Sequence, residues 1–99
     1  MTYETFQAQL HAAESLSDFD AFFAMQDPSA AEGLFRFLFL YAHDPSPRCI
    51  RSALGMTQEA FAEAFHLPLQ LVERWESGAS APRYVIDSIA YSVINKLPR

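Results

Sequence analysis

The sequence predicts an all-α protein, a small helical bundle, on three observations. Its 99 residues are 51% hydrophobic and 14% aromatic, which is enough for one domain with a core of its own. The three glycines stand far apart and β-branched residues are few before residue 85, so strand and hairpin signals are weak. Apolar residues instead recur at three- and four-residue spacing. These features favour a mostly helical, globular domain.

The first half of the chain predicts three helices. The first covers residues 2–14 and carries one apolar stripe made of Tyr3, Phe6, Leu10 and Ala13. Ser17 is expected to cap the second, because the carboxylates of the stretch Ser17-Asp18-Phe19-Asp20 would lie near the positive end of that helix. Asp27-Pro28 ends the second helix and begins the third, since proline is tolerated at the first helical position.

The third helix, residues 28–42, is apolar nearly all round from Leu34 to Tyr41. Such a helix is either the central one of the domain or a subunit interface. The aromatic residues at every second position here also fit a strand, but no partner strand is evident. A helix is therefore favoured.

The second half begins with a short helix over residues 47–54, with Pro47 at its start and Gly55 just past its end. Thr57 then caps a second helix over the stretch TQEAFAEAF. The inner face of this helix is expected to consist of Phe61, Ala62 and Phe65.

A turn at His66-Leu67 leads to the next helix, residues 68–77, which turns Leu71 or Val72 inward together with Trp75. Gly78 closes this helix and Pro82 opens the last one. The last helix has apolar residues at helical spacing, namely Val85, Ile86, Ile89, Ala90, Val93, Ile94 and Leu97. Two short helices joined by a tight turn inside a bundle make a helix-turn-helix.

Charge divides the chain near residue 45. Residues 1–46 carry seven acids and one arginine, a net charge of −6, and residues 47–99 carry six bases and five acids, a net charge of +1. The prolines of Asp44-Pro45-Ser46-Pro47 mark this change with a break that a helix cannot cross. Phosphate would repel the acidic half. We therefore expect an acidic, aromatic-rich segment, 1–46, for dimerisation or partner binding, and a helix-turn-helix domain, 47–99.

Residues 47–95 resemble the Cro/repressor type of helix-turn-helix, the XRE family. The likeness rests on Ile50-Arg51, Gly55-Met56-Thr57-Gln58, Phe61-Ala62, Leu67, Val72, Trp75-Glu76, Gly78 and Pro82. The two stretches IRSALGMTQEAFA and LPLQLVERWESG look most like short regulators found with toxin–antitoxin modules and related autoregulators. The resemblance implies a sequence-specific transcriptional regulator, a repressor or autoregulator, whose partner is double-stranded DNA.

The same resemblance assigns roles to individual side chains. Base reading falls on Leu69, Gln70 and Arg74 of the helix over residues 68–77, which would enter the major groove. Glutamine suits adenine, arginine suits guanine, and a leucine can pack on a thymine methyl group. Contacts to the DNA backbone are expected from Thr57, Gln58, Arg48, Arg51 and Arg83.

Three departures from the family pattern keep a second function open. His66 stands where the family usually has glycine, Pro68 stands at the cap of the next helix, and Glu73 would oppose phosphate. The alternative is a protein–protein interaction module, an antitoxin or a phage-type inhibitor, whose helix-turn-helix only keeps its shape.

A homodimer is also expected. One helix-turn-helix contacts too few base pairs for genomic specificity, and the aromatic residues between positions 34 and 41 exceed what short helices need to bury. Either this aromatic segment or the last helix could form the dimer.

Other kinds of chemistry find little support in the sequence. The single Cys49 excludes an internal disulfide and fits a reducing cytosol. No secretory signal is visible, and the longest apolar stretch, 33–42, is about half a membrane span. The three histidines share no ligand spacing and no glycine-rich phosphate loop is present. We therefore expect a soluble cytoplasmic protein that has no metal or other cofactor and is not an enzyme.

Overall fold

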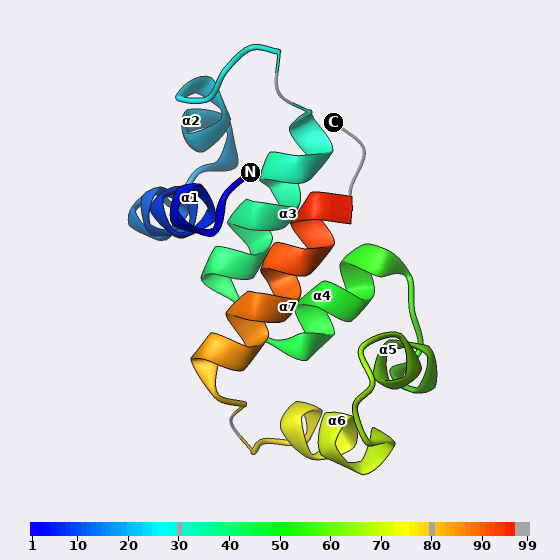
Figure 1. Cartoon of the computed structure of the whole chain (residues 1–99). Coiled ribbons are helices and arrows are strands. Elements are labelled where there is room, and N and C mark those ends of the chain that lie inside the picture. Colours follow the sequence, from blue (N-terminus) through cyan, green and yellow to red (C-terminus); the bar gives the residue numbers. More distant parts are fainter. Residues whose placement is uncertain (30, 80, 97–99) are drawn as a thin grey trace.

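The protein is built from helices packed about one core (Figure 1). The computed structural model describes residues 1–29, 31–79 and 81–96. The helices in these ranges are α1 (Tyr3–Ser15), α2 (Phe19–Ala24), α3 (Glu32–His43), α4 (Pro47–Leu54), α5 (Gln58–Ala64), α6 (Leu69–Glu76) and α7 (Arg83–Lys96). No strand occurs within these ranges. The predicted all-α bundle is confirmed.

Helices α3 and α7 run side by side through the middle of the molecule (Figure 1). Helices α1 and α2 pack against α3, and α4 contacts both α3 and α7. The buried side chains of α3 are Leu34, Phe35, Phe37, Leu38, Tyr41 and Ala42. Of the two roles expected for this apolar helix, the central one is confirmed, and its alternating aromatic residues lie on a helix rather than a strand.

One hydrophobic core spans both halves of the chain. Its members run from Phe6 in α1 to Ile94 in α7, so residues on either side of position 45 pack together. The predicted stripe of α1 is confirmed, because Phe6, Leu10 and Ala13 are buried and Tyr3 packs against them. None of the helices in the described part of the chain is long and apolar enough to cross a lipid bilayer.

Two helix starts in the first half differ from the prediction. Asp18 caps α2 in place of Ser17, because its carboxylate accepts a hydrogen bond from the backbone N–H of Asp20 at 3.0 Å. Helix α3 begins at Glu32 and not at Pro28. The Asp27 carboxylate accepts hydrogen bonds from both the backbone N–H and the hydroxyl of Ser29, which holds this stretch as a turn.

The helices of the second half begin and end close to the predicted residues. Helix α4 spans the predicted 47–54, and Gly55 follows it with a φ of 66°. Thr57 caps α5 as predicted, since its hydroxyl accepts the backbone N–H of Ala60 at 3.1 Å. Helix α6 is one residue shorter at each end than the predicted 68–77, with Pro68 as its N-terminal cap. The predicted apolar face of α7 is confirmed as far as Ile94, and Leu97 lies outside the described residues.

Candidate nucleic-acid interface

The candidate interface is the pair of helices α5 and α6, which pack together at one end of the molecule (Figure 1). The turn between them closes with a hydrogen bond from the Leu67 N–H to the Ala62 carbonyl at 2.8 Å. His66 adopts a φ of 55° in this turn, the left-handed conformation that its position predicts. Phe61 on α5 and Val72 on α6 are fully buried and hold the two helices on the core.

The outer face of α6 carries a row of exposed polar side chains. Gln70, Glu73, Arg74 and Ser77 are exposed and recur at helical spacing. The first predicted base-reading residue, Leu69, is half-buried and packs against the core, so it does not share this exposure. Gln70 and Arg74, one turn apart, are the two predicted base readers that the structure presents together.

Arg74 differs from the other described arginines in having no charged partner. Its side chain makes no ion pair with any residue that the structure describes, whereas Arg36, Arg48, Arg51 and Arg83 each do. A guanidinium on an exposed helix face keeps all five of its donors available for a ligand.

Glu76 ends α6 and binds two of the arginines predicted to contact the DNA backbone. Arg51 donates to its carboxylate from two nitrogens, at 2.7 and 3.0 Å, and Arg48 reaches it at 3.5 Å. The hydrogen bonds from Arg51 hold the pKa of Glu76 below its usual value, and they raise the pKa of Arg51. The Glu76 side chain is 3% exposed. This cluster joins α4 to α6 and sets where α6 lies.

Arg51 and Arg48 differ in how many of their guanidinium donors remain available to a ligand. Arg51 is 23% exposed and also donates to the Met56 carbonyl at 3.3 Å, so its guanidinium serves the fold. Arg48 is 63% exposed; it donates to the Glu76 carboxylate at 3.5 Å and to the Glu76 backbone carbonyl at 3.3 Å, and its remaining guanidinium donors can take a further partner. Gln58, another predicted backbone contact, is half-buried, and its side chain helps to lower the pKa of Glu76.

Arg83, the remaining predicted backbone contact, ties α7 to the acidic half of the chain. It donates to Asp87 and to Glu14, each at 2.9 Å. The buried Asp87 carboxylate also accepts the Tyr41 hydroxyl at 2.5 Å. Burial and this hydrogen bond raise the pKa of Tyr41, while for Arg83 the bonds to Asp87 and Glu14 outweigh burial and raise its pKa. The network holds α1, α3 and α7 together.

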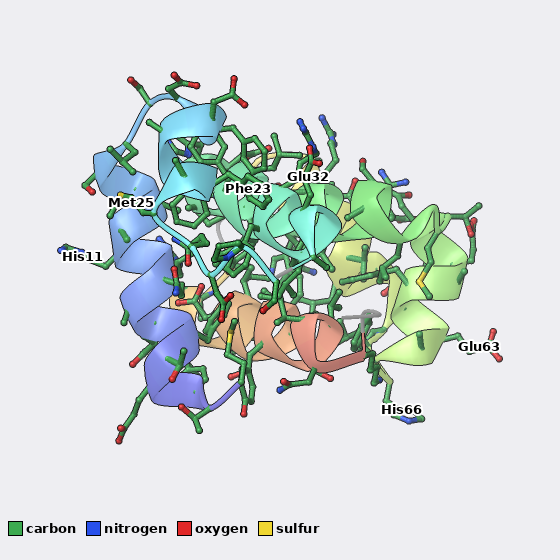
Figure 2. The ribbon with its side chains drawn as sticks, turned by 90° about the horizontal axis from the view of Figure 1, so that it is seen from above. His11, Phe23, Met25, Glu32, Glu63 and His66 are labelled. Carbon is green, nitrogen blue, oxygen red and sulfur yellow. The ribbon has the colours of Figure 1, made fainter. Side chains whose placement is uncertain are left out.

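Most of the exposed charge on α5 and α6 is acidic. Glu59, Glu63 and Glu73 are exposed and outnumber Arg74. Figure 2 shows Glu63 and His66 pointing away from the body of the molecule, at the opposite side from His11.

The neutralisation of Glu76 within the fold was not foreseen from the sequence. The available signal was its place four residues after Val72, on the inner face of the same helix.

Other reactive groups are dispersed or buried. Cys49 is half-buried, and burial together with the nearby charge of Asp44 raises its pKa to about 11, so the thiolate form is scarce at neutral pH. Among the described residues, no three His, Cys, Asp or Glu side chains gather as ligands for one metal ion.

These features define a class of protein, a small all-α bundle in which a helix-turn-helix presents a polar face on its second helix. Comparison with protein-family models, with characterised proteins and with solved structures finds no significant match.

Proposed function

We propose that the protein is a sequence-specific DNA-binding transcriptional regulator of the XRE family, a repressor or autoregulator, which inserts α6 into the major groove. The observation that carries the proposal is the outer face of α6, where Arg74, which forms no ion pair with any described residue, and the exposed Gln70 lie one turn apart. An arginine can donate two hydrogen bonds to guanine, and a glutamine can pair with adenine, each for about 1–3 kcal/mol of discrimination.

Phosphate contacts would be few. Of the predicted backbone arginines, Arg51 and Arg83 are held in ion pairs within the fold, and Arg48 is the most exposed of the three. Each neutralised phosphate contributes about −0.9 to the slope of log K against log salt concentration. With Arg74 reading a base and Arg48 left to neutralise a phosphate, we expect a shallow slope of about −1 for each bound chain.

The test is an electrophoretic mobility shift with DNA that flanks the protein's own gene, at about 50 mM salt and micromolar protein. Arg74→Ala and Gln70→Ala should each cost about 1–3 kcal/mol and relax the preference at one base pair. Gln7→Ala is the matched control for Gln70→Ala, because Gln7 is exposed on α1, outside α5 and α6, and its substitution should leave the base preference intact. If both α6 variants bind the same DNA with unchanged preference, α6 is not the reading helix.

The proposal extends to assembly and location. We expect a cytoplasmic homodimer with its two α6 helices about 34 Å apart, and we expect residues 1–46 to serve dimerisation or to bind a further protein partner. The proposed regulator needs no cofactor and has no catalytic activity.

A second candidate function is a protein–protein interaction module, an antitoxin or phage-type inhibitor. The exposed acids Glu59, Glu63 and Glu73 favour it, because they repel phosphate and attract a basic protein surface. The mobility shift separates the two functions. Non-specific binding alone would be visible at about 50 mM salt, so the absence of any retarded band supports the module.

A further inference from the structure

Glu73 is the exposed charge of α6 to which the proposed function gives no role. Its carboxylate neither forms an ion pair nor accepts a hydrogen bond within the part of the chain that the structure describes. Glu76, the other acid of this helix, is 3% exposed and holds Arg51 and Arg48. Adjacent residues of a helix do not face each other, so Glu73 does not pair with Arg74 either. A carboxylate without a partner therefore stands beside the two side chains expected to read bases.

The direction of Glu73 follows from the geometry of α6. At about 3.6 residues per turn, successive side chains are turned by about 100° about the helix axis. Measured from Leu69, Glu73 lies at about 40°, and Gln70 and Arg74 follow at about 100° and about 140°. The buried Val72 lies at about 300°. Glu73 therefore points within the sector that the predicted base readers define, and not toward the core.

Glu73 also lies between Gln70 and Arg74 along the helix axis. The rise is about 1.5 Å per residue, so these two residues are about 6 Å apart along α6. All three side chains are exposed. When Gln70 and Arg74 reach base edges, the carboxylate between them is directed into the same groove.

The major-groove edges of the bases decide what such a carboxylate can bind. An ionised carboxylate only accepts hydrogen bonds. Guanine presents only acceptors there, and thymine presents an acceptor and a methyl group. Adenine presents a donor next to an acceptor, whereas cytosine presents its N4 amino donor alone. Cytosine is therefore the base that a carboxylate favours, and a base edge made of acceptors repels it.

We propose that Glu73 is a specificity-determining residue, whose carboxylate accepts a hydrogen bond from the N4 amino group of a cytosine in the operator. This role rests on the proposed DNA binding by α6 and adds a base contact to those of Gln70 and Arg74. The same charge set against a phosphate would only weaken binding. Facing a cytosine, it excludes the wrong bases instead.

The test selects binding sites from a pool of random DNA duplexes, first with the wild type and then with Glu73→Gln. The wild type should enrich a site with cytosine at one position, and the variant should lose the preference at that position. A glutamine amide can turn its oxygen toward cytosine or its NH2 group toward thymine, so it accepts both bases. Because Glu73 is exposed, the variant should keep its helices, which circular dichroism checks.

The second measurement is a ratio of Kd values for two duplexes, one with cytosine and one with thymine at this position. The wild type should bind the cytosine duplex about 5- to 150-fold more tightly, as expected of one base contact. Glu73→Gln should bring the ratio to within about two-fold of equality. Glu63→Gln is the matched control, because Glu63 is exposed on α5 and points away from the body of the molecule (Figure 2). It loses the same charge and should keep the wild-type ratio.

A Glu73 that only repels phosphate would give a different result. Its replacement would then tighten binding to both duplexes alike and leave the ratio unchanged, which overturns the proposal. A wild type that shows no cytosine preference at any position altered by Glu73→Gln overturns it as well. A wild type that enriches no site and retards no DNA removes the regulator itself, and the role of Glu73 with it.

Discussion

Glu76→Gln should destabilise the protein strongly, although it changes only one atom. The carboxylate accepts two hydrogen bonds from Arg51 and one from Arg48, and its side chain is 3% exposed. Glutamine keeps the shape but removes the charge that compensates these guanidinium groups. The substitution therefore leaves a partly buried cation without its anion.

The size of the effect follows from burial. Removing one partner of a fully buried ion pair costs about 3–5 kcal/mol, and a hydrogen bond to a charged group is worth about 1.5–3 kcal/mol. Because Arg51 is 23% exposed, water recovers part of the loss. We expect a decrease of about 2–3 kcal/mol in the free energy of unfolding, which in a domain of this size lowers the melting temperature by roughly 10–20 °C.

The assay is urea denaturation followed by circular dichroism, with Glu73→Gln as the control. Glu73 is exposed on the same helix, so its substitution makes the same chemical change outside the cluster. Should the two variants differ by less than about 0.5 kcal/mol, Glu76 does not hold α4 and α6 together and the reasoning fails.

The same carboxylate predicts a dependence on pH. Its pKa is lowered in the folded state, so its contribution to stability is complete above the ordinary glutamate pKa of about 4.3. The contribution is lost as the pH falls from there through the lower, folded-state pKa. The wild type should therefore lose more stability in this acid range than Glu76→Gln does, as measured by urea denaturation at a series of pH values.

Four further substitutions test other parts of the fold by the same denaturation assay. Tyr41→Phe should cost about 1–2 kcal/mol, because the buried Asp87 loses one of its donors, and a loss below about 0.5 kcal/mol would show that this bond adds little. Phe61→Ala should cost about 3–5 kcal/mol and Trp75→Ala less, since Phe61 is fully buried and Trp75 only half-buried; the reverse order would contradict the packing. His66→Gly should stabilise the protein by about 0.5–1 kcal/mol by relieving its positive φ, and a loss of stability would mean that the imidazole contributes to the turn.

The helix limits of the second half could be predicted because the groups that set them lie next to each other in the chain. A proline at the first helical position and a glycine in the left-handed conformation bound α4, and a threonine hydroxyl three residues from its donor caps α5. In the first half, two neighbouring residues could each cap the N-terminus of α2, and the cap is Asp18 rather than Ser17. Similarly, the Asp27 turn displaced the start of α3 from Pro28 to Glu32.

The sequence by itself determined that the protein is helical, that its α5–α6 pair is a helix-turn-helix, and which exposed residues of α6 lie one turn apart. All of these depend on backbone periodicity and on neighbours within a few residues. Only the tertiary structure decided that Arg51 pairs with Glu76, 25 residues away, and that Arg83 pairs with Glu14, 69 residues away. It also decided that Leu40, a large apolar residue of α3, stays exposed. Coulomb attraction and burial depend on distances in space, and these distances exist only once the helices have packed.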